Sequence, residues 1–111
     1  MLVNLNPSNS AVNVAEDLRG AKTPTTVSVT NALTVALAAN ASRACYAIYN
    51  VGPATVHLRE GSIVSATLYE VLIPAGFYYK EDFASARYTG QVSVITASGT
   101  ASLQVSEGLL T

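Results

Sequence analysis

Few residues in this chain carry a charge, and the basic ones are dispersed. Only 12% of the 111 residues are charged, against ~25% in an ordinary soluble domain. Six lysines and arginines against seven acids leave a formal net charge of -1, with no run of basic residues. A nucleic-acid partner would require such a run, because its phosphates must be neutralised. We therefore expect no nucleic-acid partner, and we expect other protein to cover part of the surface.

Side chains that build reactive sites are also scarce, since the chain has one cysteine, one histidine and no tryptophan. Cys45 and His57, twelve positions apart, fit no tetrahedral metal pattern. Glu81 and Asp82 are the remaining cation candidates, but adjacent residues on an extended chain point apart. No glycine-rich loop that could hold a phosphate is present. We expect no metal, no cofactor and no enzymatic activity.

Long apolar runs are missing as well. No stretch approaches the ~20 apolar residues that span a bilayer. The first ten residues lack the basic start and apolar centre of a secretory signal. We expect neither a membrane partner nor export by that route.

What is present divides the chain into an arm, residues 1–24, and a β domain, residues 25–111. The first 24 residues contain four asparagines and two prolines and show no sustained alternation. One or two helical turns between Ser10 and Gly20 are an option, with the serine as cap and the glycine as stop. The arm is interpreted either as a flexible tail or as a segment that becomes ordered against a neighbouring subunit.

The rest of the chain alternates apolar and polar residues with a period of two, which is typical of β-strands. Residues 91–106, "QVSVITASGTASLQVS", predict a hairpin that turns at Ser98 and Gly99. In this register one apolar face pairs the following residues: Val92 with Val105, Val94 with Leu103, and Thr96 with Ala101.

Residues 43–60 predict a second hairpin around a loop at 50–53, with Arg43 facing Glu60. One face then holds Cys45, Ala47, Val56 and Leu58, and the opposite, outer face holds Tyr46, Ile48, His57 and Arg59. Cys45 and His57 project to opposite sides, which excludes the contact of a Cys–His catalytic pair. We expect a buried cysteine and a histidine at the sheet surface or in an interface.

Shorter segments complete the predicted fold. Residues 27–29 are expected to pair with residues 33–35, and further strands are expected near 68–73 and 77–80, joined by a tight turn at "IPAG". Seven or eight short strands with regular turns indicate an all-β domain. We expect an antiparallel β-sandwich or a jelly-roll-like barrel.

Tyrosine is the one abundant aromatic residue, with six copies against two phenylalanines. Tyr78 and Tyr79 are adjacent, and neighbours on a strand face opposite ways. One of the two should therefore be exposed, where a tyrosine suits a protein interface or a sugar-stacking platform.

Residues 43–107 resemble a known group of proteins. The segments "IYN", "LIPAGFYY", "YTGQVSVI" and "GTASLQVSE" are similar to those of small β-sandwich virion proteins of tailed bacteriophages, which decorate or cement heads or form parts of tails. Residues 1–42 lie outside the resemblance. It implies a structural component of the virion and supplies no catalytic residues.

The resemblance and the composition together favour a head cement or decoration protein on the outer surface of the phage head. The expected partners are the major capsid protein and further copies of the chain, as a homodimer or homotrimer. The alternative is a receptor- or carbohydrate-binding module of a tail fibre or spike. The expected contact residues are Leu2, Val3, Leu5, Val12, Leu18, Tyr46, Ile48, His57, Arg59, Tyr78 and Tyr79.

Overall fold

A computed structural model of the chain describes residues 22–82 and 87–110. Within these residues, β-strands are the only regular secondary structure. The strands are β1 (Thr25–Val29), β2 (Thr34–Leu37), β3 (Arg43–Pro53), β4 (Val56–Glu60), β5 (Val71–Ile73), β6 (Tyr78–Glu81), β7 (Val92–Thr96) and β8 (Ala101–Leu109). These residues include no helix with the length and hydropathy needed to cross a membrane.

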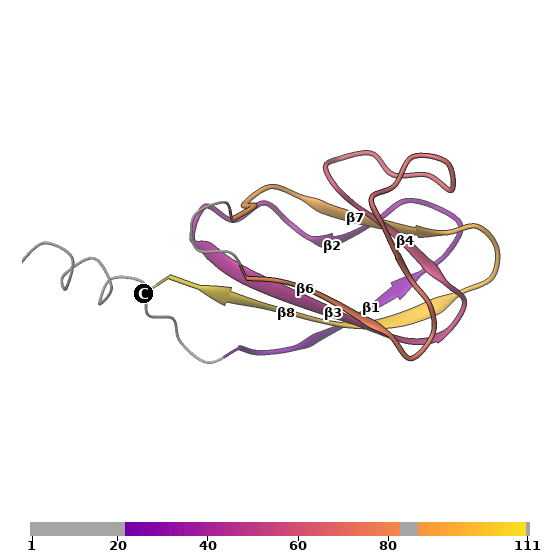
Figure 1. Cartoon of the computed structure of the whole chain (residues 1–111), viewed down its shortest axis with the longest axis horizontal. Helices are drawn as coiled ribbons and strands as arrows, with labels where there is room; N and C mark the ends of the chain where they lie inside the picture. Colours follow the sequence, from indigo (N-terminus) through magenta and orange to yellow (C-terminus); the bar gives the residue numbers. More distant parts are fainter. Residues whose placement is uncertain (1–21, 83–86, 111) are drawn as a thin grey trace, which may run out of the picture.

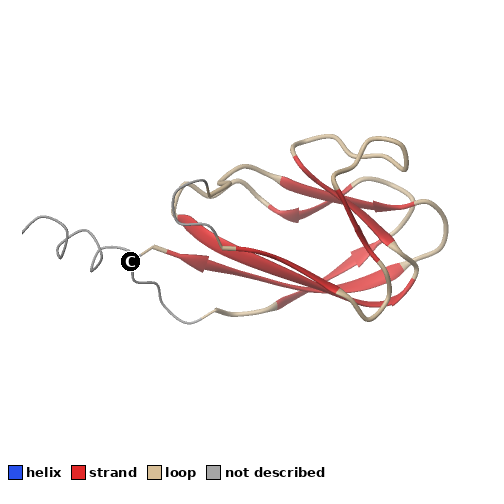
Figure 2. Ribbon diagram, viewed as in Figure 1, coloured by secondary structure: helices blue, strands red, loops and turns tan. Residues whose placement is uncertain are grey.

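The eight strands form two four-stranded antiparallel sheets that pack face to face (Figures 1 and 2). The first sheet has the order β1-β8-β3-β6, and the second has the order β2-β7-β4-β5. The prediction of an all-β, antiparallel sandwich with seven or eight strands is confirmed.

The strand pairing follows a single rule. β1 pairs with β8, β2 with β7, β3 with β6 and β4 with β5. The described chain therefore has the connectivity of one long hairpin that turns between β4 and β5. This hairpin is folded over, so that its first and last strands, β1 and β8, lie in one sheet and the strands at its turn lie in the other. Additional β3–β8 and β4–β7 pairs close each sheet. This connectivity is that of a jelly roll, one of the two architectures expected from the sequence.

The three predicted pairings between consecutive strands are wrong. β7 and β8 lie in different sheets, as do β1 and β2, and β3 and β4. Val92 pairs with Glu60 and Leu37 rather than with Val105. Each of these connections passes from one sheet to the other instead of turning within one sheet. The apolar pattern does not distinguish the two arrangements, because inward-facing residues can pack against each other across a sandwich or lie side by side on one sheet.

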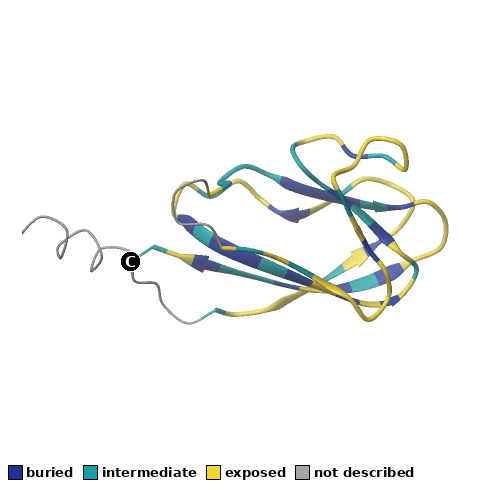
Figure 3. Ribbon diagram, viewed as in Figure 1, coloured by how far each residue is buried: buried dark blue, intermediate teal, exposed yellow. Residues whose placement is uncertain are grey.

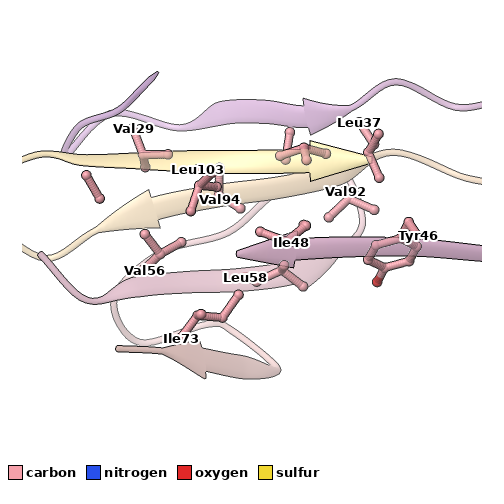
Figure 4. Close-up of a cluster of buried hydrophobic side chains, with 13 residues drawn as sticks. Val29, Leu37, Tyr46, Ile48, Val56, Leu58, Ile73, Val92, Val94 and Leu103 are labelled. Carbon is pink, nitrogen blue, oxygen red and sulfur yellow. The ribbon is translucent and has the colours of Figure 1, made fainter. Parts of the chain in front are cut away.

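The core between the sheets collects the inward residues of both layers (Figure 4). It includes Leu103 and Val105 from the first sheet and Val92 and Val94 from the second. These four were predicted to share an apolar side, and that part of the prediction is confirmed even though their strands do not pair. Burial of such side chains contributes about 1.5–3 kcal/mol each, so the interior between the sheets supplies most of the folding energy.

Arg43 closes one end of the sandwich and is completely buried. Its Nε donates to Glu107 Oε1 at 2.8 Å, which links β3 to β8. Its terminal nitrogens donate to the backbone carbonyls of Ala38, Tyr88 and Gly90. The predicted exposed pair of Arg43 with Glu60 is wrong, since those residues belong to strands of different sheets.

Replacing Arg43 should destabilise the whole domain. Arg43→Met leaves three carbonyls and a carboxylate without their donor, and we expect the free energy of unfolding to fall by about 3–5 kcal/mol. Lys80→Met is the control, because its ion pair with Asp82 is solvent-exposed and should contribute less than about 1 kcal/mol. Urea unfolding followed by circular dichroism measures both. Equal stability of the two variants would contradict this role of Arg43.

Candidate functional site

The structure describes six of the eleven expected contact residues. These are Tyr46, Ile48, His57, Arg59, Tyr78 and Tyr79. The five expected in the arm, Leu2, Val3, Leu5, Val12 and Leu18, lie outside the described residues.

Tyr46 and Ile48 are core residues, and their predicted exposure is wrong. Their exposed fractions are 1% and 0%, and Figure 4 shows both among the side chains of the interior. Pairing of β3 with β8 and β6 turns these two residues toward the second sheet. The opposite side of β3, which carries Ala47 and Tyr49, faces outward instead.

Among the described residues, the three most exposed aromatic side chains come from the neighbouring strands β3 and β6 and from the residue before β6. Tyr78 is 70% exposed and lies directly opposite Tyr49, which is 42% exposed. Val51, two residues further along β3, is 54% exposed, and Phe77, which directly precedes β6, is 62% exposed. We call these four residues the aromatic patch. In Figure 3 the turn that precedes β6 and the start of that strand are coloured as exposed. Tyr78 was predicted as a contact residue; Tyr49 was not, because its exposure depends on which strands flank β3.

A buried polar anchor holds the aromatic patch in place. Asn50 lies between Tyr49 and Val51 and is completely buried. Its Nδ2 donates to the carbonyls of Ala54 and Ile73 at 2.8 and 2.7 Å, and its Oδ1 accepts from the Gly52 amide at 2.8 Å. Its backbone bonds to Phe77 and Gly76 at 2.9 and 2.7 Å. The patch therefore rests on a fixed scaffold rather than on a free loop.

The predicted "IPAG" turn is part of this anchor. The Phe77 amide donates to the Pro74 carbonyl at 3.0 Å, and Gly76 has a φ of 84°, a backbone conformation that favours glycine. The turn is confirmed. It connects strands of different sheets, so it carries the chain from the second sheet to the aromatic patch.

Gly52 should tolerate no side chain at the base of the patch. Its φ is 102°, and an added Cβ would lie 2.9 Å from the Cβ of Ala75. Gly52→Ala is expected to lower the free energy of unfolding by about 2–4 kcal/mol, from backbone strain and overlap together. Gly76→Ala is the matched control, because φ is also positive there but nothing lies within 4 Å, so only about 1 kcal/mol should be lost. Chemical denaturation distinguishes the two, and equal losses would contradict the close approach at Ala75.

Two tyrosines bond to two carboxylates next to β6, and one of these bonds connects the two layers. The Tyr46 hydroxyl donates to Glu60 Oε2 at 2.6 Å, from the first sheet to the second, and the Tyr79 hydroxyl donates to Glu81 Oε2 at 2.7 Å. The two rings are 6.1 Å apart. Tyr79 is half-buried against the core, so of the adjacent pair only Tyr78 is fully exposed. The expectation that one of the two lies outside is confirmed.

The environment of these phenols keeps them protonated. Burial raises the pKa of Tyr46 far above its ordinary value of 10.0, and the hydrogen bond to Glu60 raises it further. Burial likewise raises the pKa of Tyr79, followed by the hydrogen bond to Glu81. The Tyr46–Glu60 bond is therefore a structural latch between the sheets, the Tyr79–Glu81 bond lies within β6, and neither tyrosine is available as a nucleophile.

Alkaline pH should destabilise the protein through the phenols of Tyr46 and Tyr79. The unfolded chain releases these phenolic protons near pH 10 and the folded chain keeps them, so stability is fully present below pH ~10 and is lost above it. The expected slope is about 1.4 kcal/mol per pH unit for each tyrosine.

Tyr46→Phe should lower that slope by one tyrosine and reduce stability at pH 7 by about 1–3 kcal/mol, because Glu60 loses its donor. Urea titrations between pH 7 and roughly 11 measure both effects. An alkaline slope that is unchanged in the variant would contradict the assignment.

His57 and Arg59 lie on the outer face of the second sheet. His57 is flanked by Leu72 and Ile95 on the neighbouring strands, and its ring meets the Tyr69 ring edge-on at 4.7 Å. Arg59 donates to the Ile63 carbonyl at 2.9 Å. The predicted outward direction of both residues is confirmed, but the loop between β4 and β5 partly covers them. Large exposed residues nearby are Leu33, Val35, Leu68, Tyr69 and Leu72.

Neither a nucleophile pair nor a metal centre is assembled in the part of the chain that the structure describes. Cys45 is buried and belongs to the first sheet, whereas His57 belongs to the second. Asp82 Oδ2 lies 3.4 Å from Lys80 Nζ, and Glu81 accepts a hydrogen bond from the Tyr79 hydroxyl. Residues 22–82 and 87–110 contain no group of three or more metal-binding side chains suited to a metal ion. What these residues offer is surface for contact.

Comparisons with protein-family models, with curated proteins and with solved structures found no match to this chain.

Proposed function

We propose that the chain is a structural protein of a bacteriophage particle, which binds the outside of the head as a cement or decoration protein and bridges neighbouring major capsid subunits. The observation that carries the proposal is the aromatic patch. Its four large apolar side chains are exposed, and β3, which carries two of them, is held in place by the buried side chain of Asn50. Exposed, fixed tyrosines are the residues that contribute most at protein interfaces.

The composition of the chain supports a protein partner. A surface with few charges has a low cost of desolvation when it is covered, because charged groups lose most on leaving water. The resemblance of residues 43–107 to phage virion proteins agrees with this view. Jelly rolls occur in viral capsid domains and also in lectins, so the fold is compatible with the proposal without deciding it.

The proposed mechanism is mechanical. A stable contact buries about 800 Å² on each partner, which the aromatic patch and its polar border would supply against one capsid subunit. Contact with a second subunit through another surface is then effectively intramolecular, so the affinity for the assembled lattice exceeds that for one subunit. Binding that favours the assembled shell stabilises it by mass action. The arm, residues 1–24, is proposed to lie across the shell.

The test is co-sedimentation of the full chain with heads that lack it. We expect wild-type protein to pellet with the heads and Tyr49→Ala/Tyr78→Ala to bind at least thirtyfold more weakly, since an aromatic hot spot contributes about 2 kcal/mol or more. Leu33→Ala/Leu72→Ala is the matched control and should still bind, because these exposed leucines belong to the second sheet, Leu33 directly before β2 and Leu72 on β5. Failure of the wild type to pellet, or undiminished binding of the tyrosine variant, would contradict the proposal. Unaltered binding after deletion of residues 1–20 would remove the arm from the mechanism.

The tyrosine pair also favours a second candidate, a carbohydrate-binding module of a tail fibre or spike. Two neighbouring phenol rings on a rigid strand pair form a platform on which sugar rings can stack. Gln104, directly opposite Tyr49 on β8, and Lys80 on β6 are the polar side chains beside it. Glycan-array binding that disappears in Tyr49→Ala/Tyr78→Ala, without binding to heads, would favour this candidate.

A further inference from the structure

Among the edges of the two described sheets, only the outer edge of β1 carries none of the usual protections against pairing. Natural proteins protect edge strands by shortness, charge, proline or bulges. Among the four edge strands, β5 has three residues, β6 carries Lys80 and Glu81, and β2 is interrupted by a bulge between Val35 and Leu37. β1 has five residues without charge, proline or bulge.

The side chains of β1 also suit pairing. The strand reads Thr-Thr-Val-Ser-Val, and β-branched residues are the ones enriched in strands. Its five residues pair in unbroken register with β8, from Thr25 opposite Val105 to Val29 opposite Ala101. On the outer face, Gln104 donates to the Thr26 hydroxyl at 3.0 Å. No described strand pairs with the other edge of β1.

We propose that β1 pairs antiparallel with β1 of a second copy of this chain, across a two-fold axis at Val27. In this register Val27 faces its counterpart, Thr25 faces Val29 and Thr26 faces Ser28. The two first sheets then form one continuous eight-stranded sheet. The proposal concerns the isolated protein and does not rest on binding to phage heads.

A second copy fits this edge because the strand is complementary to itself. The two-fold register pairs all five residues and brings no two like charges together. It also covers Val27, which is only half-buried in the single chain. A two-fold interface uses the same patch on both subunits, as the symmetry of most homodimers requires. Strand addition at a free edge is an established mode of association, in which backbone hydrogen bonds supply the affinity.

The experiment is sedimentation velocity of the full chain and two charge variants over a range of concentrations. Thr26→Lys/Ser28→Lys places lysines opposite lysines, and Thr26→Glu/Ser28→Glu places glutamates opposite glutamates. We expect the wild type to form dimers and each variant to dimerise at least about tenfold more weakly, because like charges directly opposite are destabilising. An equimolar mixture of the two variants should restore the dimer, since every cross-strand pair then has opposite charges.

The control keeps the same two charges on the same face but on an interior strand. Gln104→Lys/Ser106→Lys on β8 should leave dimerisation unchanged, and loss of the dimer there would mean that the outer face, not the edge, is the interface. A wild type that stays monomeric at all concentrations, or a mixture that fails to recover the dimer, would overturn the proposal. Hydrogen exchange of the wild type gives a second readout that requires no variant. The β1 amides should become more protected as concentration rises, and protection that does not depend on concentration would also overturn it.

Discussion

Consecutive described strands of this chain lie in opposite sheets, except for β4 and β5, and the rest of the structure depends on that constraint. Each of these connections passes from one sheet to the other, so the inward residues of strands that are consecutive in the sequence pack against each other across the core. Because the partners within a sheet come from distant parts of the chain, β1 with β8 and β3 with β6, no described strand other than the β4–β5 pair is held locally.

Around the apolar core, a few buried polar side chains fix the position of β3, the strand that carries the exposed Tyr49. Arg43 and Asn50 are completely buried and hold the two ends of β3 through side-chain hydrogen bonds, and the Tyr46–Glu60 bond joins the layers between them. Meanwhile Tyr49 and Tyr78 stand outside. Buried polar groups with satisfied bonds fix a unique geometry, which gives the exposed aromatic side chains a rigid support for binding.

The sequence predicted the strands and most inward residues, but not which strands pair. A period of two shows which residues share a side of a strand, and this was sufficient for Val92, Val94, Leu103 and Val105. It does not show whether a turn such as Ser98–Gly99 returns the chain within one sheet or crosses to the other. Because of that ambiguity, the predicted inward and outward faces of β3 were exchanged: Tyr46 was expected outside, and the exposure of Tyr49 was not predicted. The adjacent Tyr78 and Tyr79 predicted that one of the two is exposed, but the alternation did not show that it is Tyr78.

We propose that the aromatic patch is covered in the assembled phage particle. Hydroxyl-radical footprinting compares the oxidation of Tyr49, Phe77 and Tyr78 in the free chain with that in purified phage particles that contain it. We expect strong oxidation of all three in the free protein and strong protection in the particle, with Tyr46 protected in both. Equal oxidation of the three residues in free and particle-bound protein would contradict it.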